Sequence, residues 1–365
     1  MGPPRTRRHR TRCHDKEDPV TPTRPTRLRA ARAAAARTTT AALVVAVLSS
    51  CTATPGQDST QEPAGELRIG PLNTQNTLTL ATDAGLVAEA VTAAGGTTTV
   101  TSPFPAFAPA AEAMGAGQID VTTASTTAVV PALAQGTDVV VFAVEVNDGD
   151  SQGIVSAPGT GITTVADLAG ARVAVNAGGT GEYLLRQALQ VNGMDVDDVE
   201  MVFLSPPDAA TAFVSGHVDA WATWDQYLVT AARAEGAHVV ALARDVEATN
   251  RTVHVVDGEV WRTHPGLVVA AYWALVEQAE AIIEDPELLV QAYIAAGAEE
   301  DVAREISQIT PPRVVPAHAG FAAELQQVAD FYRDQGMVTE SIDATLAAVD
   351  VTDPLRAATQ ANRSR

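Results

Sequence analysis

Residues 172–182, RVAVNAGGTGE, decide the fold class. The first four residues suit a short buried strand, and a glycine-rich turn follows them directly. The next residues, 181–191, place Leu184, Leu185, Ala188 and Leu189 on one face of a helix. A strand that turns tightly into a helix is the repeating unit of α/β proteins.

The same alternation extends outward in both directions. From residue 66 to 256 short β-type runs alternate with helical patterns, which predicts an α/β fold with mostly parallel sheets. Everything from Pro265 on is expected to be helical. Breaks near 144–152 and 245–252 divide the strands into two blocks. We therefore expect two lobes with a ligand cleft between them, at the carboxyl ends of the strands. Strands are expected at 67–70, 97–101, 119–122, 139–144, 153–156, 172–175, 201–204, 218–221, 238–242 and 253–256, and helices at 77–94, 109–117, 181–191, 207–215, 227–235, 265–284, 286–296, 299–309, 318–335 and 342–349. A short helix capped by Thr163 or Thr164 is expected between the strands 153–156 and 172–175.

Three predicted strand-to-helix junctions are rich in glycine and hydroxyl residues. They are 70–77 (GPLNTQNT), 122–127 (TTASTT) and 176–182 (NAGGTGE). Helix N-termini leave amide donors unpaired and favour anions, while hydroxyl groups add further donors. The alternative is ordinary N-capping, in which these side chains bond only to their own helices. The candidate anion-binding residues are Asn76, Thr77, Ser125, Thr126, Gly179, Thr180 and Gly181.

Charge divides the 365 residues into two parts. Residues 1–50 contain 11 Lys and Arg against 3 Asp and Glu, a net of +8, so a total of −20 leaves −28 on residues 51–365. The only lysine is Lys16. Such an acidic body excludes a protein that binds nucleic acid through a broad basic surface. A bound anion would need neutral donors, helped at most by one arginine.

The N-terminal part has the features of an export signal. An arginine-rich segment precedes the apolar run 41–48, and Leu48-Ser49-Ser50-Cys51 resembles the lipobox of bacterial lipoproteins, in which the cysteine is acylated. A plain signal peptide with an incidental cysteine is the alternative. The basic segment is unusually long, which suggests a true start at Val20 or Leu28. No run reaches 18 apolar residues, so no membrane-spanning helix is expected.

Two further stretches carry a family resemblance. Residues 204–213 (LSPPDAATAF) and 216–227 (GHVDAWATWDQY) resemble the alkanesulfonate/nitrate/taurine-type solute-binding proteins of bacterial ABC importers. Gln226 stands where that family usually has proline. Residues 178–185, Asn250 and His264-Pro265 also fit, and the resemblance extends over 66–349. It is weaker at 104–108 and 125–131, where the family's first lobe contacts its ligand.

The resemblance implies a two-lobed fold of the type II periplasmic-binding-protein kind. The implied ligand is a small organic anion, first an aliphatic sulfonate, with taurine, nitrate or a thiamine-precursor pyrimidine as alternatives. The implied partner is an ABC permease, and we expect a monomer anchored by lipid to the outer face of the membrane. The expected organisation is a signal peptide at 1–50, a tether at 51–65, lobe one at 66–147 plus 251–350, lobe two at 148–250 and a tail at 351–365.

Several side chains have two interpretations. Trp224 is expected at the cleft, where it would cover the organic part of the ligand, although both Trp221 and Trp224 could be packing residues. Asp225 could bind an ammonium group or cap the helix that follows. Asn250 joins the ligand-binding candidates. Glu182 suits a first helical turn, the pair Tyr272-Trp273 suits a core, and the histidines at 217, 238, 254 and 318 are expected at the surface or in loops.

An enzyme on the same fold is the main rival. A desulfinase of this fold needs a catalytic cysteine, and a related pyrimidine synthase uses a lysine that binds pyridoxal phosphate. Beyond Cys51 the chain has no cysteine, and beyond Lys16 no lysine. We therefore expect no catalytic residue, no cofactor and no metal site. A sensor lobe without a transporter is a third possibility.

Overall fold

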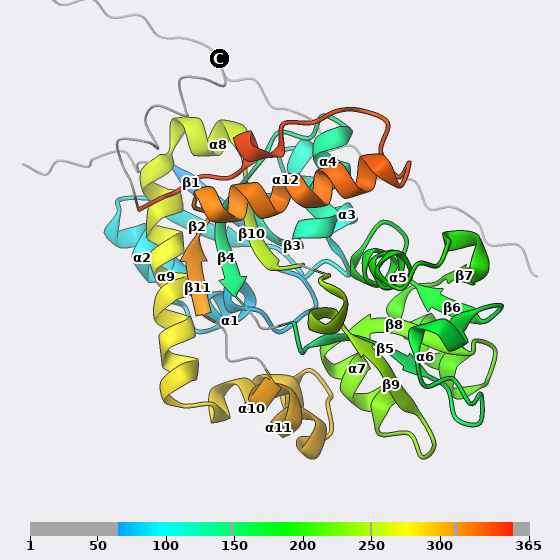
Figure 1. Ribbon diagram of the computed structural model, residues 1–365. Helices are drawn as coiled ribbons and strands as arrows, with labels where there is room; N and C mark the ends of the chain where they lie inside the picture. The colour runs from blue at the N-terminus through cyan, green and yellow to red at the C-terminus, as the bar shows by residue number, and fades with distance from the viewer. Residues whose placement is uncertain (1–64, 147–148, 249, 310–312, 353–365) are drawn as a thin grey trace, which may run out of the picture. The chain divides into compact units, whose positions relative to one another are not determined.

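Two β-sheets organise the part of the chain that the computed structural model describes, residues 65–146, 149–248, 250–309 and 313–352 (Figure 1). The first has the strand order β11-β4-β10-β3-β1-β2 and the second β7-β6-β8-β5-β9. The first sheet contains β1 (Glu66–Gly70), β2 (Thr97–Val100), β3 (Val121–Ser125), β4 (Val139–Val146), β10 (Thr252–Asp257) and β11 (Arg313–Pro316). The second contains β5 (Gln152–Ser156), β6 (Arg172–Val175), β7 (Glu200–Phe203), β8 (Ala220–Trp224) and β9 (His238–Leu242).

Both sheets are mixed, which corrects the expectation of mostly parallel sheets. β1 pairs in parallel with β2 and β3, and β6 with β7 and β8. The pairs β10–β3, β10–β4, β11–β4, β5–β8 and β5–β9 are antiparallel. A helix returns the chain between parallel neighbours, whereas the next strand along the chain after β4 is β5 of the other sheet, and the next strand after β9 is β10 of the first. Strands that cross between sheets therefore enter in the opposite direction.

Helices cover the first sheet on two faces. One face carries α1 (Thr77–Asp83), α2 (Leu86–Ala93), α8 (Gly258–Thr263) and α9 (Pro265–Glu284), and the other α3 (Phe107–Gly115), α4 (Thr126–Ala134) and α12 (Ala319–Asp334). The long α9 meets the length and composition of a membrane-spanning helix, but half of its apolar window is buried inside the fold. Its apolar face, which includes Leu267, Ala271 and Leu275, belongs to the core of the first sheet, as expected of a core helix.

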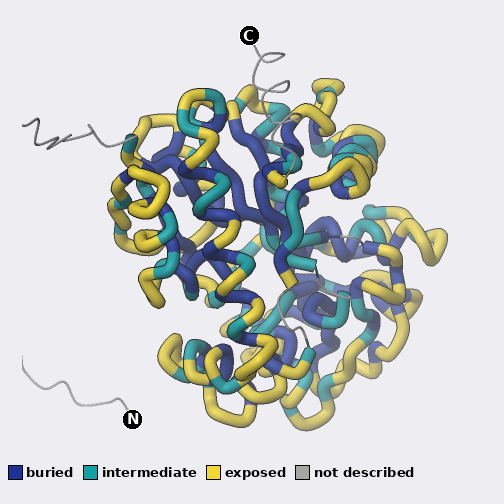
Figure 2. Tube along the Cα trace, turned by 90° about the vertical axis from the view of Figure 1, so that its left-hand side faces the viewer, coloured by how far each residue is buried: buried dark blue, intermediate teal, exposed yellow. Residues whose placement is uncertain are grey.

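The second sheet is also covered on both faces. α5 (Thr180–Val191) packs on one face, and α6 (Pro206–Val214) and α7 (Asp225–Ala232) on the other. α10 (Glu287–Ala295) and α11 (Glu300–Ile309) follow α9, and their apolar side chains pack with Val229 of α7. The 3₁₀ turns are η1 (Val165–Leu168), η2 (Val196–Asp198), η3 (Ala243–Val246) and η4 (Ala344–Ala347). Figure 2 shows the buried strands enclosed by half-buried and exposed helices.

Three expectations about the elements were wrong. The expected helix 77–94 is two helices, because Gly85 adopts φ +80° between α1 and α2. The C-terminal region is not all helical: β11 pairs with β4 through the apolar run that contains Val314 and Val315, and the expected last helix is only the 3₁₀ turn η4. β3 and β8 also end three residues later than expected, so the strands extend to Ser125 and Trp224.

The strands of the two sheets divide along the chain as β1–β4 with β10 and β11, and β5–β9. Whether 66–147 plus 251–350 and 148–250 behave as separate lobes stays a prediction. Helices α10 and α11, which we expected in lobe one, contact the second sheet's α7, and Arg233 of the segment after α7 pairs with Asp301 and Glu305 of α11. The predicted signal peptide, tether and tail, including Cys51, lie outside the described residues except for Gly65, Val351 and Thr352.

Candidate functional site

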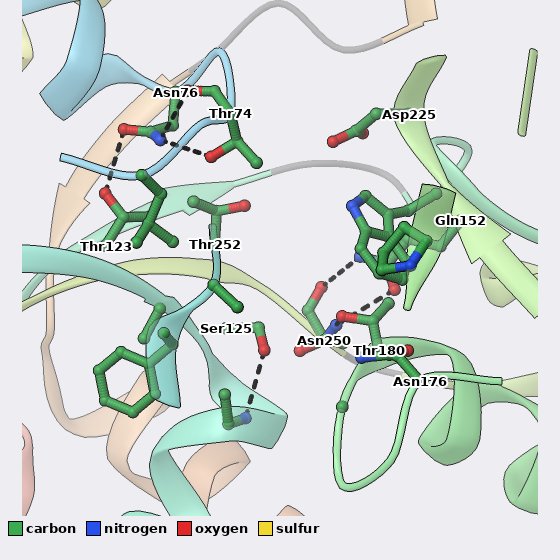
Figure 3. A pocket seen from close by; sticks show the side chains of 18 of the residues that line it. Thr74, Asn76, Thr123, Ser125, Gln152, Asn176, Thr180, Asp225, Asn250 and Thr252 are labelled. Carbon is green, nitrogen blue, oxygen red and sulfur yellow. Dashed lines mark hydrogen bonds between the residues drawn. The ribbon is translucent and has the colours of Figure 1, made fainter. Parts of the chain in front are cut away.

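A cavity of about 860 Å³ is lined by residues from both sheets. Its polar wall combines the ends of β3 and β8, the glycine turn before α5 and the segment that leads from η3 into β10 (Figure 3). Its apolar lining includes Leu72, Phe107, Leu204, Trp224 and Leu289. The cavity is thus large enough for an organic ligand and offers both apolar surface and polar groups.

The glycine turn before α5 has a specific geometry. Gly178 adopts φ +64°, and its N–H donates to Glu182 Oε2 over 2.8 Å. A Cβ on Gly181 would come within 2.4 Å of the carbonyl oxygen of Ala222, so glycine there lets α5 pack closely against β8. Gly179 and Thr180 line the cavity, whereas Gly181 is not among the lining residues. Gly181 therefore has a packing role in this structure.

Asn250 connects the two sides of the cavity. Its Nδ2 donates to Thr180 Oγ1 over 2.9 Å and to Gln152 Oε1 over 3.3 Å. Its Oδ1 accepts the N–H of Thr127, in the first turn of α4, over 3.3 Å. The side chain is buried, and all of its polar atoms are engaged. Because Asn250 holds the Thr180 oxygen as an acceptor, the hydroxyl hydrogen of Thr180 stays available to a ligand.

Ser125 and Thr126 lie at the start of α4 but differ in surroundings. Ser125 is the N-cap: its Oγ accepts the N–H of Ala128, and it lines the cavity. Thr126 is fully buried and is not a lining residue. Its N–H donates to the carbonyl of Arg251, and its Oγ1 accepts the N–H of Arg251. Thr126 therefore ties α4 to the chain segment that returns to the first sheet.

The junction before α1 is occupied by the protein's own carboxylate. Glu145, at the end of β4, accepts the N–H of Thr77 over 2.7 Å and its hydroxyl over 2.5 Å, and its Oε1 lies 3.0 Å from His254 Nε2. Burial alone would raise the pKa of Glu145, but the bonds from His254 and Thr77 outweigh it and lower that pKa. Asn76 caps α1 through Thr79. Asn76 and Thr77 both line the cavity, but the Thr77 donors bond to Glu145 and the Asn76 Nδ2 donates to Thr74.

His254 corrects the expectation that this histidine lies at the surface. It is fully buried in β10, with Thr77 Oγ1 2.9 Å from Nε2 and Thr123 Oγ1 3.1 Å from Nδ1. His254 stands between Val253 and Val255 in a buried strand, and both of its ring nitrogens have hydrogen-bond partners. Its contact with Glu145 makes it a support of the cavity wall.

Asp225 begins α7 in an unusual backbone conformation. Its φ is +46°, rare for a residue with a side chain, and its N–H donates to the carbonyl of Ser151. The N-cap of α7 is Trp224, without a side-chain cap, so the capping role considered for Asp225 is not observed. Burial raises the pKa of Asp225 to about 7, the charge of Glu145 adds to the rise, and a hydrogen bond from Ser151 opposes it.

The structure brings most of the predicted ligand residues to the cavity. Two of them, Thr126 and Gly181, are absent from its lining. Contact with a ligand stays a prediction for all ten. The eight that line the cavity are Asn76, Thr77, Ser125, Gly179, Thr180, Trp224, Asp225 and Asn250.

The remaining singled-out residues have structural roles. Trp221 is buried between Phe213 and Tyr227, while Trp224 lies at the cavity. Glu182 is buried and pairs with Arg186 as well as with the glycine turn. The pair at 272–273 is only half core: Tyr272 is buried, but Trp273 is 53% exposed.

Several lining residues were not predicted from the sequence: Glu145, Gln152, Arg251 and Tyr293. Glu145 follows six apolar residues in β4, and a charge at the end of a buried strand was a signal that could have identified it. Arg251 lies beside Asn250, and its Nε donates to Glu324 over 3.1 Å. Tyr293 comes from α10, where helical periodicity alone predicts only packing.

Comparison with known proteins agrees with this architecture. The family model described as NMT1/THI5 like matches residues 104–288. A relative from Escherichia coli (strain K12), named as an aliphatic sulfonates-binding protein, is 30% identical over 243 residues, 66% of this chain and 76% of the relative. The crystal structure of the periplasmic aliphatic sulphonate binding protein SsuA from Escherichia coli is similar at a TM-score of 0.71 and 26% identity, covering 78% of this chain and 97% of that one.

The fold is also shared with an enzyme. The desulfurization enzyme DSZB, in a mutant form complexed with biphenyl-2-sulfinic acid, has a TM-score of 0.58 and 19% identity, and covers 82% of this chain and 99% of that one. At that identity the likeness concerns the fold alone. Together these findings confirm the two-sheet fold of periplasmic binding proteins that the sequence predicted.

Proposed function

Because this chain belongs to the NMT1/THI5-like family, we propose that it is an exported solute-binding protein that captures a small organic anion for an ABC importer. The leading ligand is an aliphatic sulfonate, as the names of its relatives suggest. The observation that carries the proposal is the cavity of about 860 Å³, which residues from both sheets line. Asn250 connects its two sides through hydrogen bonds with Thr127 of α4 and Thr180 of α5.

The sulfonate would lie at the end of the cavity formed by Ser125, Gly179 and Thr180. A sulfonate has three oxygens that accept hydrogen bonds, and this end offers hydroxyl groups beside the N-termini of α4 and α5. Trp224 would cover the alkyl part. Binding would favour the arrangement in which both sides of the cavity contact the ligand, which is how such a protein signals occupancy to a permease.

Calorimetry tests the ligand class. Alkanesulfonates, taurine, nitrate and a thiamine-precursor pyrimidine are titrated into the protein in Tris chloride, because MES, HEPES and MOPS are themselves sulfonates. We expect heat of binding with alkanesulfonates. Thr180→Val should weaken binding about tenfold, since one hydrogen bond to a charged group is lost. Thr211→Val, an exposed threonine on α6, is the matched control. Heat from nitrate or the pyrimidine alone would refute the sulfonate assignment.

We further propose a lipid anchor at Cys51, which would hold a monomer at the outer face of the membrane near its permease. The support is the sequence Leu48–Cys51 at the end of an apolar run. Expression of the full chain in a bacterial host, followed by detergent phase partition and mass spectrometry, tests the anchor. The wild type should enter the detergent phase with a diacylglyceryl mass, and Cys51→Ser should stay aqueous. An unmodified Cys51 in the wild type would refute the anchor.

A further inference from the structure

Helix α12 links the two sheets. It packs against α4 on the first sheet, and its last turn meets α5 of the second (Figure 1). The ring centre of Tyr183 in α5 lies 5.2 Å from that of Phe331 and 6.0 Å from that of Tyr332. Just after these rings, Gln335 Nε2 donates to Gln190 Oε1 over 3.1 Å. The contact between α12 and α5 therefore joins the sheets directly.

Tyr332 places a polar group inside this apolar contact. Its side chain is fully buried, and its hydroxyl donates to the carbonyl of Gly178 over 3.3 Å. Burial raises the pKa of Tyr332 well above its usual value, the charge of Glu182 adds to the rise, and a hydrogen bond from the Thr127 side chain opposes it. Phenylalanine would fill the same space without a hydroxyl that needs partners. The hydroxyl therefore needs a reason other than packing.

The partner of this hydroxyl is the residue that shapes the glycine turn. Gly178 has φ +64°, in the left-handed region that favours glycine. Its N–H donates to Glu182 Oε2 over 2.8 Å, and its carbonyl accepts the Tyr332 hydroxyl. Both polar groups of Gly178 are thus held by side chains. The next two residues, Gly179 and Thr180, line the cavity, so the position of Gly178 determines where they lie.

Asn250 makes a second link between the same two helix ends. It accepts the N–H of Thr127 and donates to Thr180 Oγ1. Asn250 and Tyr332 therefore both connect the first turn of α4 with the start of α5, where the anion is proposed to bind. Donors that are already held in place bind a ligand more tightly than mobile donors, because binding does not have to order them.

We propose that Tyr332 is a positioning residue for the ligand: its hydroxyl holds the glycine turn in the conformation in which Thr180 lines the cavity. The role rests on the proposed function, since the ligand at Thr180 is the sulfonate of that proposal. Gly178 is half-buried and Ala177 is exposed, so water can replace the lost donor when the hydroxyl is removed. The loss should therefore loosen the turn and leave the rest of the fold intact.

Hydrogen exchange of the ligand-free protein, followed by mass spectrometry of peptides covering 176–183, tests the effect on the turn. Three N–H groups of the turn are protected by hydrogen bonds, those of Gly178, Gly179 and Gly181. In Tyr332→Phe they should exchange about three- to tenfold faster, whereas the amides of the buried strand β4 should exchange as in the wild type. Tyr272→Phe is the matched control, because Tyr272 is a buried tyrosine of α9 and belongs to the core of the first sheet.

Calorimetry and stopped-flow fluorescence test the effect on the ligand. Ethanesulfonate, butanesulfonate and hexanesulfonate are titrated in Tris chloride. Tyr332→Phe should bind them about three- to tenfold more weakly than the wild type, and Tyr272→Phe equally well. The loss should appear mainly as faster dissociation, since the turn holds the bound anion. A role of Tyr332 in packing alone would leave affinity and dissociation rate unchanged.

A measurement on the wild type needs no variant. Saturating hexanesulfonate should slow hydrogen exchange at 176–183 and at 331–335 together, because Tyr332 joins the glycine turn to the last turn of α12. Slower exchange at the glycine turn alone would contradict the link.

The outcomes separate this role from the proposed function. Unchanged affinity for sulfonates in Tyr332→Phe refutes the positioning role, whatever the exchange at the turn, and leaves the proposed function standing. Faster exchange at the turn, with no heat from any alkanesulfonate in the wild type, refutes the proposed function and supports the hold of Tyr332 on the turn. A variant that does not fold, or that loses protection throughout both sheets, refutes the role, because Tyr332 then acts as a core residue.

Discussion

Replacement of Asn250 by alanine should destabilise the fold and weaken ligand binding together. Three side-chain bonds disappear: those to Thr180 and Gln152, and the one from the N–H of Thr127. Each such bond stabilises a protein by about 0.5–1.5 kcal/mol net. The bond to Thr180 is short, whereas the other two are near 3.3 Å and should lie at the lower end. The loss should be about 2–3 kcal/mol in the free energy of unfolding.

Urea unfolding followed by tryptophan fluorescence measures this loss. Asn192→Ala is the matched control, because Asn192 is exposed at the end of α5 and bonds only to its own helix. The control should lose less than about 1 kcal/mol. Calorimetry on Asn250→Ala should also show weaker binding, since Thr180 loses the donor that orients its hydroxyl. A free energy of unfolding within about 0.5 kcal/mol of the wild type would refute the role assigned to Asn250.

Three further predictions test the charged groups. Glu145→Gln should destabilise the protein at pH 7 but little near pH 3. Because the pKa of Glu145 is lowered in the folded state, its bonds with Thr77 and His254 stabilise the fold above the unfolded pKa, and this stabilisation is lost on acidification. Equal effects at both pH values in urea titrations would contradict this. Asp225→Asn should stabilise the fold at pH 8 and hardly at pH 4. The raised pKa of Asp225 means that the wild type loses stability as pH rises from about 4, where the unfolded carboxyl ionises, to about 7, where the folded one does. A variant less stable than the wild type at pH 8 in the same urea titrations would disprove this. Asp120→Asn should lower the free energy of unfolding by about 3 kcal/mol, and by more than Asp219→Asn does. The reason is burial: the Asp120 side chain is 2% exposed and that of Asp219 is 30% exposed. Thermal unfolding of both variants measures the two losses, and equal losses would contradict this prediction.

Local patterns predicted the elements that depend on local physics. The strand-turn-helix unit at 172–191 and the apolar strand β4 follow from glycine conformation and burial, and both are present. β11 was missed because a strand of four residues pairs only through a distant partner, here β4. The mixed direction of the sheets was missed for the same reason. Strand direction depends on which sheet the chain enters next, and no local pattern records that.

In the candidate site, too, local sequence predicted some features, while others depend on residues far away in the chain. Residues at the three junctions were expected at a cavity because strands end there, and most of them line one. Which of their donors remain free for a ligand could not be predicted, because these donors bond to residues far away in the sequence. Thr77 donates to Glu145, and Asn250 donates to Thr180. Glu145 itself carries a usable signal. A carboxylate at the end of a buried strand must find donors or face a cavity, and here it does both.

The same short sequence motif, a glycine followed three residues later by an aspartate, occurs once in each sheet. Residues 117–121, GQIDV, and 216–220, GHVDA, each begin with a glycine of positive φ, +66° in the first and +69° in the second, and have an aspartate three residues later. In each sheet that aspartate binds the backbone and guanidinium of an arginine on the neighbouring parallel strand, and the arginine also donates to the glycine carbonyl. Arg68 pairs with Asp120, and Arg172 with Asp219.

In each sheet this aspartate–arginine pair lies at the amino end of a strand, β3 or β8, whose carboxyl end reaches the cavity. Five residues after Asp120 the first sheet presents Ser125, and five residues after Asp219 the second presents Trp224. The two positions are therefore structural equivalents on different sheets, one a hydroxyl and the other an indole. A common scaffold with a polar group on one sheet and an aromatic group on the other suits a ligand that has chemically different ends.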